Sequence, residues 1–172
     1  KPGISQVLIE MRASGICRSD LHFLYRVPEE KRNKPQDFGL ICPPDIISGH
    51  EPCGVVKVLG PGVQNLKIGD RVAVHHISGC GFCNNCRKGW YIVCENKSGT
   101  YGFDRNGSNA EFMLADEKDC VILPSEVSFG VGAWSSCGAG TAYGALKRLN
   151  MPTLDSLAFF GVGQVGLATV FL

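Results

Sequence analysis

Apolar and polar residues alternate in short runs over roughly the first 124 positions of the chain. Val7, Ile9 and Met11 alternate with polar neighbours, which is the two-residue period of a half-buried strand. "EPCGVVKVLGPGV" at 51–63 and "LKIGDRVAVHH" at 66–76 read as further short strands separated by Gly/Pro turns, and "AEFMLADEKDCVILP" at 110–124 continues the pattern. The pattern predicts a mainly β domain.

A different pattern begins after Pro124. Small residues dominate, and 141–149 read as a helix. "DSLAFFGVGQVGLATVFL" at 155–172 then predicts an apolar strand, a glycine turn and an apolar helix, which is the first βα unit of a nucleotide-binding sheet. Since the chain starts without methionine just before a strand and stops within an apolar stretch, we interpret it as a fragment of a longer protein.

Composition narrows the function classes. The 172 residues carry a formal net charge of +1 with scattered Lys and Arg, so nothing indicates a nucleic-acid or membrane-surface partner. The longest apolar run, 157–172, is too short to span a bilayer, and no signal peptide is recognisable. Nine cysteines without an export signal predict a reducing, cytoplasmic location.

Four cysteines fall within fifteen residues of each other in "CGFCNNCRKGWYIVC". Cys80, Cys83 and Cys86 are each separated by two residues, and Cys94 follows. This spacing lets four thiolates close a tetrahedral shell, so it predicts a structural zinc site on a solvated loop. An iron–sulfur cluster, a redox pair and simple packing thiols are the alternatives.

Six motifs in order carry a family resemblance. They are "GICRSDLH" at 15–22, "GHE" at 49–51, "GDRV" at 69–72, the four-cysteine lobe, "CGAGTAYGAL" at 137–146 and "GVGQVG" at 161–166. In this order they resemble the zinc-dependent medium-chain alcohol dehydrogenases. The resemblance implies a GroES-like catalytic domain over 1–124 with a zinc lobe at 79–95, a connecting helical segment over 125–150, and the truncated start of a Rossmann domain over 151–172.

The resemblance also implies a second, catalytic zinc held by Cys17, His50 and Cys137. Spacing alone does not show this, because these residues lie 33 and 87 positions apart. Each does sit beside glycine, which we interpret as a short turn from which a side chain can enter a cleft. Three protein ligands leave a fourth position for a substrate oxygen, where zinc can acidify an alcohol or polarise a carbonyl.

The residues around these ligands match further parts of the family site. Ser19 matches the hydroxyl beside the substrate oxygen, and His22 matches the outer proton relay, a role that an imidazole suits because it can both accept and donate a proton. Asp20 matches the carboxylate that orients the ligand histidine. Glu51 matches a glutamate beside the zinc that becomes a ligand in some polyol-oxidising relatives. The alternative for the first three is an exposed polar turn.

The glycine motif predicts a nicotinamide cofactor. Gly161 would make the tight turn, Gly163 would admit the pyrophosphate, and Gly166 would pack helix against strand. The resemblance adds Arg18 facing the pyrophosphate and Thr141 beside the nicotinamide ring, although Thr141 also suits a helix cap. The residue that selects NAD or NADP would lie past position 172.

Several residues fit less simply. Cys53 and Cys120 lie in strand-like runs and are interpreted as packing residues, whereas Cys42 has no assigned role. His75 and His76 depart from the family pattern, since the position of His76 is commonly an apolar or aromatic wall of the substrate pocket. A polyol or a hydroxy-amino compound is therefore a candidate substrate in addition to a simple alcohol.

These observations together predict a zinc-dependent oxidoreductase that transfers hydride between an alcohol or polyol and NAD or NADP, with two zinc ions per chain. The full-length protein is expected to form a homo-oligomer. Two alternatives are a zinc-independent quinone-type reductase of the same fold and a non-enzymatic zinc-stabilised binding module. Neither accounts for all six motifs.

Overall fold

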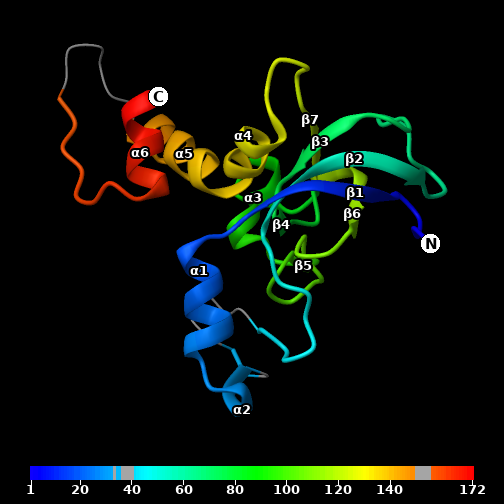
Figure 1. Ribbon diagram of the computed structural model, residues 1–172, viewed down its shortest axis with the longest axis horizontal. Coiled ribbons are helices and arrows are strands. Elements are labelled where there is room, and N and C mark those ends of the chain that lie inside the picture. The colour runs from blue at the N-terminus through cyan, green and yellow to red at the C-terminus, as the bar shows by residue number, and fades with distance from the viewer. Residues whose placement is uncertain (33, 36–40, 150–155) are drawn as a thin grey trace.

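A five-stranded antiparallel sheet lies at the centre of the chain (Figure 1). The computed structural model describes residues 1–32, 34–35, 41–149 and 156–172. The strands of the sheet follow the order β6-β1-β2-β3-β7, and β4 and β5 form a separate two-stranded sheet. The strands are β1 Gln6–Gly15, β2 Glu51–Leu59, β3 Arg71–Val74, β4 Ile77–Ser78, β5 Gly99–Thr100, β6 Phe112–Asp116 and β7 Cys120–Ile122.

Alternation along the strands builds the core, as the sequence predicts. Val7 and Ile9 of β1 are fully buried, and they meet Val56 of β2 and Val72 of β3 in one apolar cluster. Burying an aliphatic side chain of this size contributes about 1.5–3 kcal/mol. The mainly β prediction for the first part of the chain is therefore confirmed.

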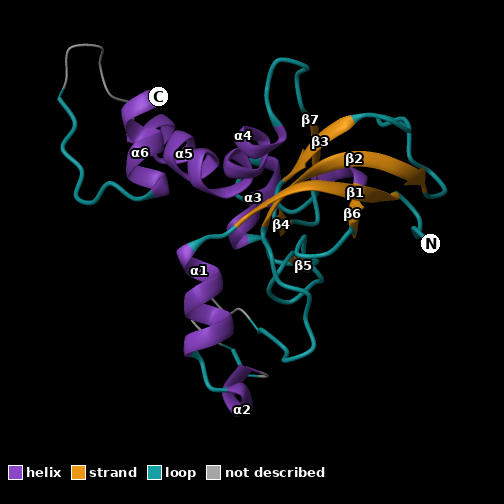
Figure 2. Ribbon diagram, viewed as in Figure 1, coloured by secondary structure: helices purple, strands orange, loops and turns teal. Residues whose placement is uncertain are grey.

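The helices lie outside the sheet (Figure 2). Two helical segments are wound as wide π-helical turns. One follows α1 directly, and the other joins α4 to α5. The helical segments are α1 Arg18–Asp20, the π-helical Leu21–Arg26, α2 Glu29–Arg32, α3 Asn84–Arg87, the 3-10 turns Tyr91–Val93 and Glu117–Asp119, α4 Phe129–Trp134, the π-helical Ser135–Ala139, α5 Gly140–Leu149 and α6 Gln164–Phe171.

The helix predicted over 141–149 exists but begins much earlier. It runs on from α4 through the wide turn Ser135–Ala139, and Ser128 caps its start by accepting a hydrogen bond from the Val131 N–H at 3.3 Å. Thr141 therefore lies inside a helix, and the expectation that it caps one is wrong. Ser128 is the cap because it directly precedes the first turn of the helix, whose backbone N–H groups have no partner within the helix.

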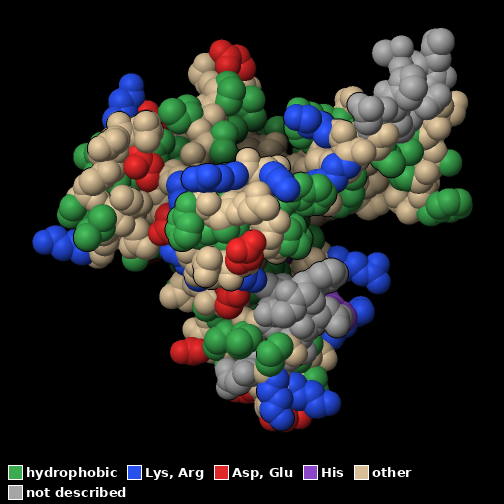
Figure 3. Space-filling model, turned by 180° about the vertical axis from the view of Figure 1, so that it is seen from behind, with side chains coloured by type: hydrophobic (Ala, Val, Ile, Leu, Met, Phe, Trp, Pro, Cys, Tyr) green, Lys and Arg blue, Asp and Glu red, His purple; other side chains and the backbone are tan. Residues whose placement is uncertain are grey.

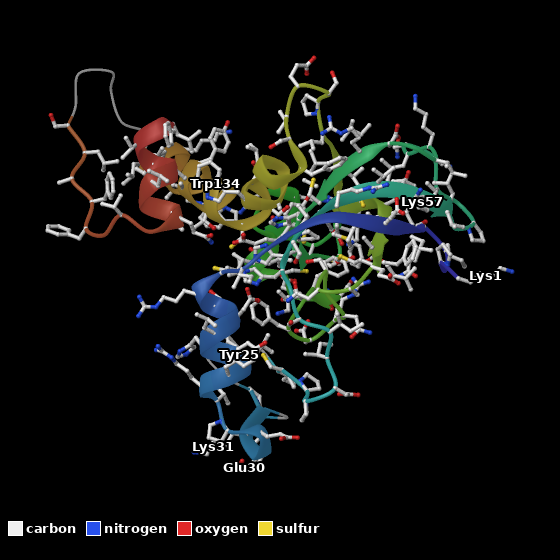
Figure 4. All side chains as sticks on the ribbon, in the orientation of Figure 1. Lys1, Tyr25, Glu30, Lys31, Lys57 and Trp134 are labelled. Carbon is white, nitrogen blue, oxygen red and sulfur yellow. The ribbon has the colours of Figure 1, made fainter. Side chains whose placement is uncertain are left out.

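The segment after Cys17 is also helical, contrary to the alternative of a polar turn. It projects from the sheet, so that Tyr25, Glu30 and Lys31 lie far from Lys57 (Figure 4). Its inner face is anchored by an apolar cluster that includes Cys42, a residue the sequence left unassigned. The cluster consists of Phe23, Leu24, Cys42 and Phe103.

The C-terminal part forms its helix but not its strand. Helix α6 confirms the predicted apolar helix, and Gly161 makes the preceding turn with φ +96°, a conformation that glycine adopts without strain. Residues 156–160 belong to neither sheet, so the strand predicted there is wrong for these residues. A strand needs a hydrogen-bonded neighbour, and none of β1–β7 pairs with this segment. The proposed boundary between 150 and 151 falls outside the described residues.

Charged side chains of both signs are interspersed over the face seen in Figure 3. This agrees with the small net charge of the sequence. Within the described part of the chain, none of the helices combines the length and the apolar character needed to cross a bilayer.

Candidate metal centre

The four cysteines of the lobe at residues 79–95 converge on one point. Their sulfur atoms all lie within 4.8 Å of one another. The Sγ atoms of Cys80 and Cys86 are 3.9 Å apart, and those of Cys83 and Cys94 are 3.8 Å apart. Tetrahedral ligands at a zinc–sulfur distance of about 2.3 Å would be separated by about 3.8 Å. The sulfurs therefore have the spacing of a closed zinc shell and are much too far apart for disulfides.

Backbone N–H groups surround these sulfurs and favour the thiolate form. Cys83 caps α3, and its Sγ accepts from the Cys86 N–H at 3.4 Å, while Cys94 Sγ accepts from the N–H groups of Cys80 and Asn96, each at 3.3 Å. The Cys86 N–H is the main reason that the pKa of Cys83 falls to about 6. Thiolates are the form that binds zinc, so the donor set fits that metal.

A second cluster forms where β1 ends and β2 begins. The register pairs Gly15 of β1 with Glu51 of β2, which brings Cys17 beside His50 despite their separation in sequence. Cys137 reaches them from the wide turn Ser135–Ala139. The ligand atoms of Cys17, His50, Glu51 and Cys137 lie within 4.8 Å of one another. The structure thus brings together the three residues that the resemblance implied, with Glu51 beside them.

Their local settings differ from the turns expected for all three. Cys17 is the N-cap of α1, and His50 directly precedes a strand, but Cys137 lies within a helix. The expectation of a turn at Cys137 is wrong. The helix there is wound as a π turn, a distortion that is frequent at functional sites, and the Cys137 side chain enters the cluster from this turn.

Asp20 connects two of the predicted ligands. Its Oδ2 accepts from the Cys17 backbone N–H at 2.8 Å, and its Oδ1 lies 2.8 Å from His50 Nδ1. Asp20 and His50 are both almost fully buried. The carboxylate accepts from Nδ1–H, so Nε2 is the nitrogen left to bind a metal once it has lost its own proton.

The groups of this cluster shift one another's proton affinities. A hydrogen bond from Cys137 is the main cause that lowers the pKa of Cys17 to about 3, and it raises the pKa of Cys137 far above its usual range. Burial lowers the pKa of His50, but bonds to Asp20 and Cys17 outweigh it and raise that pKa to about 9. A thiolate, an imidazole and a second sulfur that meet in a buried place form a soft donor set suited to zinc.

A shallow cleft of about 470 Å³ lies against this cluster. It is lined on one side by Cys17, Arg18 and Ser19 and on the other by residues of the glycine turn, including Gly161, Gly163 and Gly166. Arg18 therefore shares a cleft with the predicted cofactor motif. Gly166 is packed so closely that an added Cβ would meet the carbonyl oxygen of Gly161.

Other predicted residues lie less centrally. Ser19 Oγ is 3.8 Å from Cys17 Sγ, and His22 follows three residues later in the same helical segment, exposed, with its ring edge-on to Phe23. Thr141 is exposed on α5. Cys53 is fully buried in an apolar cluster and Cys120 packs against the sheet core, as predicted.

His76 proves to be a close neighbour of the cluster. Its ring centroid is 5.2 Å from that of His50, and its Nδ1 lies 3.0 Å from the carbonyl oxygen of Ser136. Burial is the main cause that lowers its pKa to about 4. His76 is thus a neutral ring beside the predicted ligands.

Gln164 was not singled out from the sequence. It occupies a variable position of the glycine motif, and nothing local marks it. Its Nε2 nevertheless lies 2.7 Å from Glu51 Oε1 and 3.1 Å from Cys17 Sγ.

Comparison with known proteins places the fold in a family. The family model for the alcohol dehydrogenase GroES-like domain matches residues 3–125. This chain belongs to the alcohol dehydrogenase GroES-like domain family. The zinc-type alcohol dehydrogenase-like protein YphC of Escherichia coli is 45% identical over 175 residues, covering 99% of the chain and 48% of YphC. The chain thus spans about half the length of the curated relatives it matches.

Solved structures of alcohol dehydrogenase type share the fold. An acetophenone reductase from Geotrichum candidum in complex with NAD superposes with a TM-score of 0.84 at 29% identity, covering 99% of this chain and 47% of that one. A cobalt- and zinc-bound thermostable alcohol dehydrogenase from Pyrobaculum aerophilum also gives 0.84 at 29% identity, covering 98% and 47%. The GroES-like fold and the family predicted from the sequence are confirmed.

Proposed function

We propose that this chain is the metal-binding part of a zinc-dependent dehydrogenase that exchanges hydride between an alcohol or polyol and a nicotinamide cofactor. The observation that carries the proposal is the convergence of Cys17, His50 and Cys137, which the sequence separates widely, at the end of a cleft. Zinc bound there would supply Lewis-acid chemistry, which acidifies an alcohol or polarises a carbonyl. The cysteine lobe would hold a second zinc with a purely structural role.

The chain's own residues would position the reactants and carry the proton. Asp20 holds the imidazole of His50 in its metal-binding tautomer. Ser19, beside Cys17, would accept the substrate's hydroxyl proton while it gives its own proton toward His22, which follows three residues later in the same helical segment. Because His22 is exposed, it can pass that proton to water.

The cofactor would bind along the glycine turn. Arg18 faces this turn across the cleft, where its guanidinium suits a pyrophosphate. The likeness to a reductase solved with NAD favours a nicotinamide dinucleotide, and the choice between NAD and NADP is left to binding measurements. Thr141 is assigned to the nicotinamide side of the site only by resemblance.

A polar substrate is favoured over a purely apolar one. His76 places a neutral imidazole beside the metal cluster; its Nδ1–H donates to the Ser136 carbonyl oxygen, so its Nε2 is left to accept a hydrogen bond from a second hydroxyl or amino group. We therefore propose a polyol or hydroxy-amino compound. Screening substrates that differ by one hydroxyl tests this directly.

Metal analysis of the full-length protein tests the proposal. We expect two zinc ions per chain, with Cys17→Ser losing one zinc and all turnover while the lobe keeps the other. Cys120→Ser is the matched control, since that thiol packs against the sheet core away from both clusters, and it should keep both ions. Normal turnover in Cys17→Ser would refute the assignment and favour a zinc-independent reductase. A single lobe zinc in the wild type would favour a binding module.

Two further expectations concern the intact protein. Phe82, Ile92 and Val93 of the lobe are more than half exposed, which suits burial between copies of the chain in a homo-oligomer. Light scattering measures this. No disulfide joins any of the nine cysteines, all of which lie in the described residues, and this suits a reducing compartment such as the cytoplasm.

A further inference from the structure

Gln164 is the first residue of α6 and also the fourth of the six residues of the glycine motif. Its backbone is fixed by two neighbours: Gly163 precedes it as the N-cap, and its carbonyl oxygen accepts from Trp134 Nε1 at 3.3 Å. Trp134, labelled in Figure 4, belongs to α4, whose continuation carries Cys137. The position of Gln164 is thus tied to the helix that supplies a predicted ligand.

Its side chain reaches into the metal cluster. The Nε2 atom lies 2.7 Å from Glu51 Oε1 and 3.1 Å from Cys17 Sγ. A carboxamide nitrogen carries two hydrogens, so one donor can serve each acceptor at the same time. The amide therefore holds a carboxyl oxygen and a sulfur that come from positions 113 and 147 residues away.

The structure leaves room for both partners of this bond. A side chain at Gly15 would collide with the carboxylate of Glu51, and a Cβ at Gly138 would approach Gln164 Cδ to 3.2 Å. Glu51 is 2% exposed, so its carboxylate has little access to water as a substitute donor. A buried carboxylate is costly without such a donor, and the amide supplies one.

We propose that Gln164 is a positioning residue that engages the Glu51 carboxylate beside the metal cluster and so opposes its binding to the metal. The Glu51 oxygen already lies within 4.8 Å of the other three ligand atoms, which is close enough to complete a four-ligand shell. The amide competes for that oxygen, and it links the glycine turn to the openness of the metal site. This inference rests on the proposed function.

The test measures metal binding in the full-length protein after removal of its zinc. Gln164→Met keeps the length of the side chain but removes both donors, which frees Glu51 to act as a fourth protein ligand. We expect zinc at the Cys17 cluster to bind about tenfold more tightly. The variant lacks the hydrogen bond that stabilises the arrangement in which Glu51 does not bind the metal, and one such bond to a charged group accounts for a change of this size. The visible absorption bands of the cobalt-substituted protein should shift as well. Gln64→Met is the matched control, because Gln64 is exposed in the turn after β2.

A double variant separates the positioning effect from a general structural effect. When Glu51→Gln is already present, adding Gln164→Met should change the zinc affinity less than twofold, because the side chain at position 51 no longer carries the carboxylate that Gln164 engages. A tenfold change that persists in this background overturns the inference. So does an unchanged affinity and cobalt spectrum in Gln164→Met alone.

Two outcomes distinguish this inference from the proposed function. If Gln164→Met does not fold, Gln164→Asn gives the same test, since it keeps the amide but is one methylene short of Glu51; it should also tighten zinc binding, and an unchanged affinity would overturn the inference. Wild-type protein that binds no metal through Cys17, His50 and Cys137 refutes the proposed function itself. Wild-type binding without any effect of Gln164 refutes only the positioning role.

Discussion

Asp20 offers the sharpest test of how this chain prepares its metal site. The side chain is 4% exposed, and each of its oxygens makes one 2.8 Å contact, to the Cys17 N–H and to His50 Nδ1. Replacing it by alanine removes the cap of α1 and the restraint on His50 together. Loss of a cap costs about 1 kcal/mol, and loss of the carboxylate behind a ligand histidine typically lowers metal affinity about 10–100-fold.

We therefore expect Asp20→Ala to weaken zinc binding at the Cys17 cluster by about two orders of magnitude. Asp20→Asn keeps an acceptor oxygen but loses the charge, so we expect it to weaken zinc binding at this cluster only about tenfold. The lobe zinc should be unaffected in both. Competition with a chromophoric chelator measures each affinity in the full-length protein.

The matched control is Asp45→Asn, the same chemical change at an exposed position in the loop before His50. It should leave both affinities unchanged. If Asp20→Ala binds zinc within twofold of the wild type, His50 does not depend on Asp20 for its orientation. The account of the site as a pre-arranged donor set would then be refuted.

Two further predictions concern stability. Cys83→Ser should release the lobe zinc and lower the unfolding temperature, seen by calorimetry, while a zinc content that stays at the wild-type value would contradict the four-sulfur shell. Burial raises the pKa of Asp116, but bonds from Arg105 and Gln6 outweigh it and hold that pKa below its usual range. A depressed carboxyl pKa stabilises the fold above the unfolded pKa of about 4, and the benefit disappears as pH falls below it. Asp116→Asn should therefore cost about 2 kcal/mol in urea unfolding at pH 7 and progressively less below pH 4; a difference that does not depend on pH would contradict this.

The parts of the site differ in how far the sequence predicts them. The lobe follows from local spacing, because two residues between cysteines already let their sulfurs share one ion. The second cluster does not, since Cys17 and His50 meet only through the pairing of Gly15 with Glu51. Only the family resemblance identified these ligands in advance. Their roles in catalysis remain predictions.

The errors have physical causes as well. Ser128 carries the signal for the start of the long helix, but the small residues that follow it are weak helix formers. The sequence therefore predicts the helix only from position 141, with Thr141 as an alternative cap. The apolar run at 157–160 has the composition of a strand, yet a strand also needs a partner. Gln164 was missed because its partners become visible only after folding.

The wide turn at Ser135–Ala139 has a consequence for how this site can change. Each residue of an ordinary helix rotates the next side chain by about 100° around the axis, so the extra residue in a π turn sets the direction in which Cys137 points. Deleting one residue of that turn would restore regular winding and swing the sulfur away, although every ligand would still be encoded. The length of this turn therefore matters as much as the identity of Cys137, because a shortened turn would keep the fold and the cysteine lobe while it removes one predicted ligand from the second cluster.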